Sequence, residues 1–194
     1  MLKINGKITD IKLKKITKYI LEDSKNNLNI VEIFGVDGAG KSYLASKIIR
    51  NILKKKNIRI KILHLWKFKD SNPVQSNQTP YLKSNYLYPI SLIKEIYITI
   101  QIIILICKIF IIRKLRLTYV FERSIYDVVI DPSRYLLSHK PILIKLIYNL
   151  FFKDTKKIYI NTSFEIIRKR KNELTRKKYI SLIKRLDKLF EKRK

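Results

Sequence analysis

Cysteine, glycine and proline are scarce in this 194-residue chain, which contains one, four and five of them respectively. A single cysteine, Cys107, excludes an internal disulfide framework and is typical of a protein from a reducing compartment. The few glycines and prolines exclude collagen-like and low-complexity designs. Because 46% of the residues are hydrophobic and 11% are aromatic, the chain is long and apolar enough to fold as an ordinary domain.

Acidic residues are also scarce, since 15 Asp and Glu stand against 43 Lys and Arg, for a formal net charge of +28. A field this positive attracts phosphates, nucleic acid or an anionic membrane surface. The abundance of Ile, Lys and Asn is also what an AT-rich genome encodes by default, so composition bias accounts for part of the charge. Charge alone therefore does not name the partner.

An uncharged apolar run long enough to cross a membrane is absent. Residues 1–23 are basic and contain no apolar run of signal-peptide length. The longest charge-free piece of the most hydrophobic stretch (90–112) is residues 96–107, which is 12 residues, whereas a span needs about 20. We interpret this stretch as a buried core helix of a cytoplasmic protein. The alternative is a helix lying on a membrane surface, with Lys94 and Lys108 among its flanking charges.

Apolar periodicity predicts strands that alternate with helices along the chain. Strands are expected at 30–34, 58–66, 118–121 and 157–160. Helices are expected at 42–56, at 90–112, at 136–152 with a break at Pro141, and from near Ser163 and Thr175. This alternation predicts an α/β fold in which a parallel sheet carries helices on both faces. Residues 1–29 are interpreted as a separate N-terminal extension whose helix is capped by Asp10, and residues 30–194 as the main domain.

The strongest motif is GVDGAGKS, residues Gly35–Ser42, which fits G-x-x-x-x-G-K-[ST] between an expected strand and an expected helix. Three of the four glycines of the chain fall in this window. The backbone N–H groups of such a loop, with the N-terminus of the following helix, bind phosphate. Lys41 then reaches the terminal phosphates, and the Ser42 hydroxyl coordinates magnesium. The motif predicts phosphate binding without fixing the reaction.

A second acid near the metal usually ends a strand beside the loop strand. Glu122 fits this position because it directly follows the expected strand at 118–121. Arg123 comes next, and its guanidinium can hold a phosphate through two hydrogen bonds. The alternative is a Glu–Arg pair at a strand end that faces solvent.

Three segments together resemble the thymidylate-kinase-like proteins of the nucleoside and nucleotide kinase group. They are GVDGAGKS, FERSIYDVVIDPSRY at 121–135 and RKNEL at 170–174, and their order and spacing match that family. The resemblance covers roughly residues 30–190. It implies a three-layer P-loop fold like that of nucleoside monophosphate kinases, an ATP-dependent kinase activity with Mg²⁺, and a basic lid near residues 163–178.

The resemblance also implies roles for particular residues. ATP would be bound by Gly35, Gly38, Ala39, Gly40, Lys41, Ser42 and Tyr43. Ser42 and Glu122 would hold the magnesium ion, while Lys41 would act in catalysis. Asp37 matches a position that contacts the sugar hydroxyl of the acceptor, and Arg123 matches the arginine that grips its phosphate. Arg170 matches the lid arginine that neutralises charge on the transferred phosphoryl group.

The acceptor is the part of the reaction that the sequence defines least. The family's acid after the second strand is replaced here by His64-Leu65-Trp66-Lys67, so the base that a neutral hydroxyl needs is missing there. This difference favours an acceptor that already carries a phosphate, such as a nucleoside monophosphate. Asp127, Asp131 and Arg134 resemble a divergent branch of the family that is often encoded beside surface-polysaccharide genes.

Two other functions stay open. One is a kinase of a deoxynucleoside, as the Glu-Arg-Ser run at 122–124 suggests, or of a sugar phosphate. The other is a basic nucleotide-binding module that works at nucleic acid or at a membrane without small-molecule kinase activity. The chain has no recognised nucleic-acid-binding motif, so we do not expect a nucleic-acid partner. A peripheral contact with an anionic membrane fits the charge, and a homodimer is implied by the family.

Overall fold

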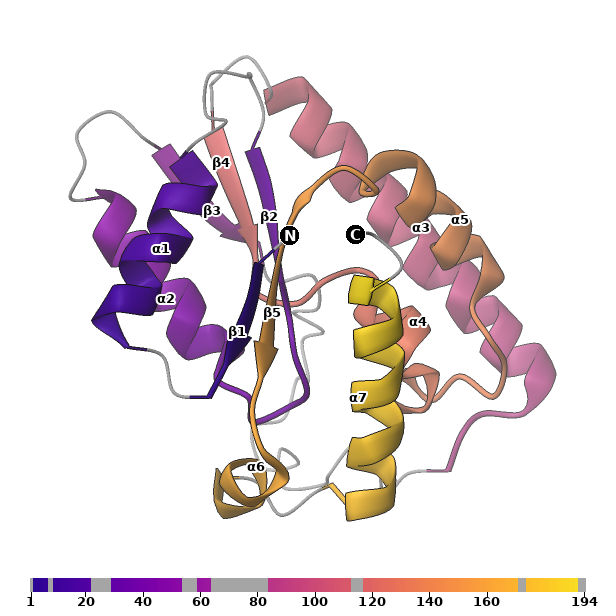
Figure 1. The fold of residues 1–194 in the computed structure, drawn as a ribbon. Helices are drawn as coiled ribbons and strands as arrows, with labels where there is room; N and C mark the ends of the chain where they lie inside the picture. The colour runs from indigo at the N-terminus through magenta and orange to yellow at the C-terminus, as the bar shows by residue number, and fades with distance from the viewer. Residues whose placement is uncertain are drawn as a thin grey trace, which may run out of the picture. The chain divides into compact units, whose positions relative to one another are not determined.

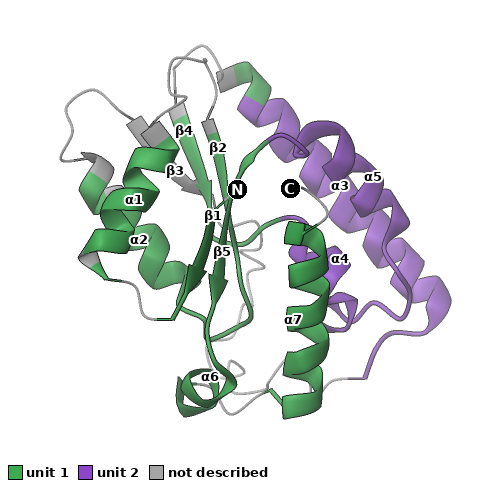
Figure 2. Cartoon of the chain, in the orientation of Figure 1, with its two compact units in different colours: residues 1–64, 110–124, 155–194 green, residues 65–109, 125–154 purple. Residues whose placement is uncertain are grey.

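The computed structural model describes residues 2–6, 9–21, 29–53, 59–63, 84–112, 117–170 and 174–191. The chain forms two compact units, which Figure 2 colours separately. Unit 1 comprises residues 1–64, 110–124 and 155–194, and unit 2 comprises residues 65–109 and 125–154. Each unit is therefore built from segments that are far apart in the sequence.

A five-stranded sheet forms the centre of unit 1, with the strand order β1-β5-β2-β4-β3. The strands are β1 (Leu2–Asn5), β2 (Asn29–Phe34), β3 (Arg59–Leu63), β4 (Leu117–Phe121) and β5 (Lys156–Asn161). Every neighbouring pair is parallel. The predicted α/β fold with a parallel sheet is therefore confirmed. Strand β1 was not predicted, and it comes from the 1–29 segment that we expected to be a separate extension.

Helices lie on both faces of this sheet (Figure 1). Helices α1 (Asp10–Leu21) and α2 (Lys41–Leu53) lie on one face and α7 (Arg176–Glu191) on the other, while α6 (Phe164–Arg170) lies beyond the carboxyl end of β5. Aliphatic side chains of α1 and α2 pack on Val31 and Ile33 of β2 to form the core of one face. The next residue of β2, Phe34, points to the opposite face, where its ring lies 5.3 Å from the ring of Phe190 in α7. The two faces of the sheet thus have different cores, one aliphatic and one aromatic.

The N-terminus of α1 differs from the prediction that Asp10 caps the helix. Asp10 is the first residue of the helix, and the backbone N–H of Lys12 donates to Thr9 Oγ1 at 3.5 Å instead. Thr9 therefore takes the capping position, which suits a hydroxyl side chain as well as a carboxylate. Ile16 and Ile20 of this helix are buried, while Ile11 is 81% exposed.

Two charged residues are buried in the middle of the sheet on its aromatic face. Glu32 of β2 and Lys157 of β5 are register partners, and each is 1% exposed. The Glu32 carboxylate accepts hydrogen bonds from the hydroxyls of Ser124 and Thr155. Lys157 Nζ donates to Thr155 at 3.1 Å (Oγ1) and 3.2 Å (carbonyl). Buried charges persist only where such partners satisfy them.

Unit 2 is helical in its described part. It holds α3 (Tyr88–Ile112, of which residues 110–112 belong to unit 1), α4 (Asp127–Ile130), a 3-10 turn (Pro132–Tyr135) and α5 (Ile142–Phe151). Glu95 of α3 is buried and joins α3 to α5, because its Oε1 accepts from the N–H of Leu143 at 2.9 Å. Its other oxygen lies 2.5 Å from His139 Nε2.

Helix α5 is shorter than the expected 136–152 helix. It begins at Ile142, directly after the predicted break at Pro141. Leu136 lies in the left-handed region with φ 58°, a conformation that ends the preceding turn and cannot start a helix.

Only one face of α3 is buried, so the prediction of a buried core helix is wrong for most of its surface. The buried residues recur at helical spacing and are Ser91, Glu95, Ile98, Ile102, Ile106 and Ile109. By length and composition alone, residues 88–111 could cross a membrane, and 33% of the most apolar window is buried in the structure. Helix α3 begins at Tyr88, two residues before the expected start at residue 90, so that Pro89 stands in its first turn.

Candidate functional site

Four neighbouring strands of unit 1 end at one pocket. Because β1, β5, β2 and β4 are parallel, the residues that follow each strand meet at the same edge of the sheet. The pocket has a volume of about 610 Å³. It is lined by Gly6, Val36, Asp37, Gly38, Ala39, Gly40, Lys41, Ser42, Tyr43, Glu122, Arg123, Thr162, Ile166 and Arg170.

The Gly35–Ser42 loop joins β2 to α2 at the centre of this edge. Gly35 has φ +156°, and a Cβ on it would lie 3.0 Å from the carbonyl oxygen of Ile160 in β5. Gly38 has φ +81°, a conformation that side chains disfavour. Ala39 N donates to the Val36 carbonyl at 3.0 Å and closes the turn. The loop therefore needs glycine where the sequence has it, and it leads directly into the N-terminus of α2.

Two other segments of unit 1 hold this loop from the side of β5. The Thr162 hydroxyl donates to the Ala39 carbonyl at 3.2 Å, and Arg170 Nη1 donates to the Gly38 carbonyl at 3.1 Å. Tyr179 of α7 donates its hydroxyl to the Thr162 carbonyl at 2.9 Å. Burial raises the pKa of Tyr179, and the nearby charges of Glu165 and Asp187 add to this rise. The Tyr179 hydroxyl therefore stays protonated at neutral pH and remains a donor.

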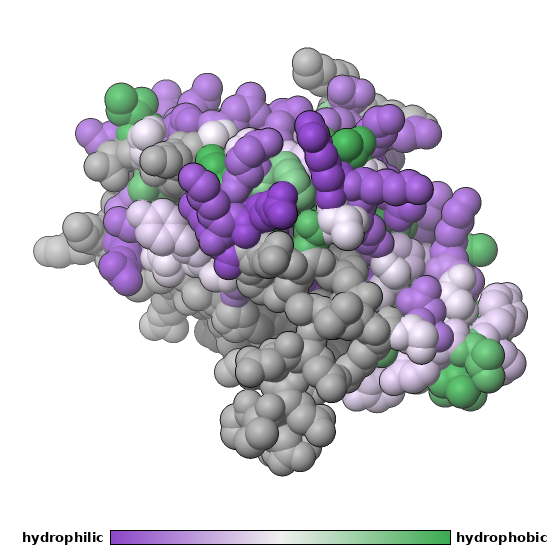
Figure 3. All heavy atoms as spheres, turned by 90° about the horizontal axis from the view of Figure 1, so that it is seen from below, coloured by the Kyte–Doolittle hydropathy of each residue, from purple (hydrophilic) through white to green (hydrophobic). Residues whose placement is uncertain are grey.

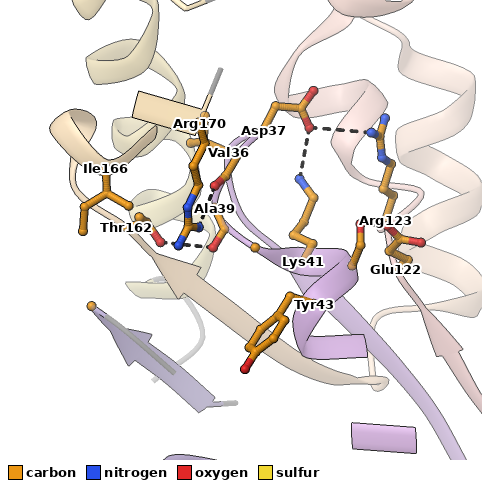
Figure 4. A pocket seen from close by; sticks show the side chains of 14 residues that line it. Val36, Asp37, Ala39, Lys41, Tyr43, Glu122, Arg123, Thr162, Ile166 and Arg170 are labelled. Carbon is orange, nitrogen blue, oxygen red and sulfur yellow. Dashed lines mark hydrogen bonds and ion pairs between the residues drawn. The ribbon is translucent and has the colours of Figure 1, made fainter. Parts of the chain in front are cut away.

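Two cations converge on a single carboxylate in the pocket (Figure 4). Asp37 Oδ1 lies 3.6 Å from Lys41 Nζ and 3.8 Å from Arg123 Nη2. Lys41 also donates to the carbonyl of Gly35. Asp37 and Lys41 are each 6% exposed, so the lysine is placed by the fold and does not extend into solvent. An anion bound beside Asp37 would contact both Lys41 and Arg123.

The residues expected to hold magnesium are in direct contact, since the Ser42 hydroxyl donates to Glu122 Oε1. A hydroxyl and a carboxylate are oxygen donors of the kind that Mg²⁺ prefers, so the pair fits this ion. Among the described residues, no group of three or more His, Cys, Asp or Glu could hold a metal. A magnesium ion at this pair would therefore take its other ligands from phosphate oxygens and water.

The two sides of the pocket are lined by different side chains. Figure 4 shows Lys41, Glu122 and Arg123 toward one side, and Thr162, Ile166 and Arg170 toward the other. Gly6 belongs with the second group, because its N–H donates to the carbonyl of Asn161, the residue before Thr162, at 3.0 Å. A Cβ on Gly6 would meet nothing within 4 Å. Besides the Arg170 guanidinium, this side offers apolar and backbone surface to a ligand.

All but one of the site residues predicted from the sequence line this pocket. The exception is Gly35, whose carbonyl accepts from Lys41. Asp127, Asp131 and Arg134 belong to unit 2, and His64 and Trp66 lie outside the described residues.

The pocket residues that the sequence did not reveal are Gly6, Val36, Thr162 and Ile166. Thr162 lies two residues after a predicted strand (157–160), so the rule that carboxyl ends of parallel strands share an edge could have found it. No motif marks Gly6, since its place depends on the pairing of β1 with β5.

Seen from the side of this edge, most of the described surface carries hydrophilic side chains (Figure 3). Comparison with known protein families, with curated proteins and with solved structures finds no match to this chain.

Proposed function

We propose that this protein is an ATP-dependent phosphotransferase similar to thymidylate kinase, which phosphorylates a nucleoside monophosphate or a similar small phosphorylated acceptor. One observation carries the proposal. Three cations from separate segments of the chain, namely Lys41, Arg123 and Arg170, line one pocket around a glycine-rich loop. Phosphoryl transfer is mostly positioning and charge neutralisation, and such a cluster supplies both.

Each cation has its own part in this proposal. Lys41 stands at the N-terminus of α2 beside the loop, where it would contact the terminal phosphates of ATP. Arg123 would hold the phosphate of the acceptor. It comes two residues after the end of β4, next to Glu122, and its guanidinium approaches Asp37 inside the pocket. Arg170 already contacts the Gly38 carbonyl, so it would reach the transferred group without a large movement. When bound at Ser42 and Glu122, Mg²⁺ would neutralise phosphate charge.

The side of the pocket with Thr162 and Ile166 supports a nucleotide as the donor. A nucleoside is large and uncharged, and Gly6, Thr162 and Ile166 offer it apolar and backbone surface, whereas Lys41 and Ser42 offer an ammonium group and a hydroxyl to the phosphates. The phosphates would lie at Lys41 and Ser42, and the nucleoside would extend toward Thr162 and Ile166.

The direct test is ADP release from magnesium ATP with a panel of nucleoside monophosphates, nucleosides and sugar phosphates. Lys41→Ala is expected to lower turnover by at least about 100-fold, because it removes a charge that contacts the reacting phosphates. Arg50→Ala, which removes an exposed cation from the same helix, is the matched control and is expected to leave turnover unchanged. Full turnover by a folded Lys41→Ala protein would disprove the proposal.

Arg123→Ala distinguishes the class of acceptor. With a phosphorylated acceptor, it is expected to raise KM for the acceptor more than KM for ATP. With a nucleoside acceptor, KM for the acceptor is expected to change little, because that acceptor has no phosphate for Arg123 to bind. If ATP binds but no acceptor of the panel is phosphorylated, the nucleotide-binding module without kinase activity becomes the better interpretation.

A further inference from the structure

Helix α3 exposes a broad apolar stripe along its length in unit 2. Its members are 42% to 67% exposed and are Ile93, Ile96, Tyr97, Ile100, Ile103 and Ile104. They lie on the side of the helix away from the buried row that includes Glu95, Ile98 and Ile102. A soluble helix normally presents polar residues on this side, whereas α3 is apolar on both its buried and its exposed side.

Helix α5 of the same unit has a similar stripe. Its exposed apolar residues are Ile142, Leu143, Leu146, Leu150 and Phe151, while Ile144 and Tyr148 on its other side are buried. The N–H of Leu143 bonds to Glu95, so the two stripes belong to helices that are joined at this point. We call the exposed residues of these two stripes the apolar face. Its eleven exposed apolar side chains contrast with an ordinary soluble surface, on which apolar side chains are scattered singly.

Lysines mark one border of the apolar face on each helix. On α3, Lys94, Gln101 and Lys108 recur every seven residues, which places them in one row beside the exposed isoleucines. On α5, Lys145 and Asn149 form such a row four residues apart. Lysines at this border can keep their stems along apolar surface while the ammonium groups reach a more polar layer.

Acidic residues are few at the described surface of unit 2. Among the described residues of this unit there are four acids, and Glu95, Asp127 and Asp131 are buried. Only Asp154, which lies beyond the end of α5, is exposed. The described surface of unit 2 therefore combines exposed aliphatic side chains with lysines and a single exposed acid.

We propose that the apolar face docks on the surface of an anionic lipid membrane, with α3 and α5 lying in the plane of the interface. An apolar face bordered by lysines matches the acyl region and the negatively charged headgroups of such a membrane. A second copy of the chain fits less well, because it would bring the same lysines of a +28 protein against each other. A membrane-crossing α3 is also disfavoured, since Gln101 would enter the hydrocarbon and Glu95 would have to leave its partners His139 and Leu143.

The test is co-sedimentation of the full chain with vesicles of phosphatidylcholine containing phosphatidylglycerol, and with phosphatidylcholine vesicles alone, at near-physiological salt. The first variant, Ile93→Gln/Ile100→Gln/Ile104→Gln, removes apolar area at exposed positions. The second, Lys108→Glu/Lys145→Glu, reverses two exposed border charges. The control, Lys184→Glu/Lys188→Glu, makes the same change in net charge on exposed positions of α7 in unit 1.

We expect the chain to bind anionic vesicles and to bind neutral ones much more weakly. The border variant should lower the partition coefficient by about 20-fold or more, because each lysine near the surface contributes about fivefold. The triple glutamine variant should lower it at least about tenfold. The α7 control should change it less than about threefold, because its charges lie outside the proposed face.

Three results would overturn the inference. The first is no binding to anionic vesicles. The second is an equal loss in the α7 control and the border variant, which would show attraction by net charge without a specific face. The third is a dimer in sedimentation equilibrium that is lost in the triple variant and is not dissociated by vesicles. This result would assign the face to a second copy of the chain. Since every substituted residue is exposed, thermal unfolding should be unchanged, and the border variant decides the question if the triple variant misfolds.

Discussion

Unit 1 and unit 2 use the same lysine- and isoleucine-rich composition in opposite ways. Unit 1 buries its isoleucines and valines between the sheet and α1 and α2, and it brings charged side chains together in a pocket. Unit 2 buries Glu95, Asp127 and Asp131 and exposes aliphatic side chains along α3 and α5. The difference shows that a sequence pattern of apolar residues fixes where an apolar side chain lies on a helix but does not fix whether it is buried.

The buried acids extend this comparison, because the two units satisfy their buried carboxylates with different hydrogen-bond donors. Glu32 of unit 1 receives hydroxyls from Ser124 and Thr155 beside the buried Lys157. Glu95 of unit 2 accepts a hydrogen bond from the backbone N–H of Leu143, and its other carboxylate oxygen is hydrogen-bonded with His139 Nε2. In both units a carboxylate connects separate segments, which is a structural role distinct from that of Asp37 or Glu122 in the pocket.

Among the substitutions that test this comparison, the largest effect is expected on stability, at the centre of unit 1. Glu32→Leu should lower the free energy of unfolding by about 3–5 kcal/mol, because it leaves the buried Lys157 and two hydroxyls without the carboxylate. Adding Lys157→Met should recover part of this loss, since an apolar pair of similar size needs no hydrogen-bond partners. Urea unfolding measures both. A double variant less stable than Glu32→Leu would show that Lys157 does not depend on Glu32.

An intermediate effect is expected where the pocket of unit 1 meets α6. Arg170→Ala should lower kcat by about 100-fold, which corresponds to about 2.7 kcal/mol of barrier, if Arg170 neutralises the transferred group. Arg168→Ala removes an exposed cation from the same helix and should leave kcat unchanged. Steady-state kinetics with the acceptor found in the panel separates the two. Equal losses of kcat in both variants would show that Arg170 acts only as part of the overall positive charge and has no specific role.

The smallest effect is expected on the apolar face of unit 2. Leu146→Gln should change the free energy of unfolding by less than about 0.5 kcal/mol, because this side chain is already 56% exposed. Ile144→Gln, on the buried side of α5, should cost about 3 kcal/mol, because it buries an amide in place of an aliphatic side chain. Urea unfolding of the pair tests the assignment of faces. Similar costs at both positions would show that α5 is buried all round in solution.

Local signals predicted most elements of unit 1 but not its edge. The apolar run before Gly35 predicted β2, and the helical spacing of apolar residues after Ser42 predicted α2. Both elements could be predicted because each pattern is contained in a short stretch of sequence. Strand β1 has four residues and pairs with β5, more than 150 residues later. A strand this short carries too few alternating positions to stand out, so only its partner reveals it.

The sequence by itself determined the character of the Gly35–Ser42 loop, since the glycine spacing and the adjoining Lys41 and Ser42 are written in eight consecutive residues. Tertiary structure alone decided that Gly6, Thr162 and Ile166 complete the pocket around it, because parallel pairing of distant strands brings their carboxyl ends to one edge. It also decided that α3 exposes most of its isoleucines. Hydrophobicity is a property of each residue, whereas burial depends on which other segments pack against it.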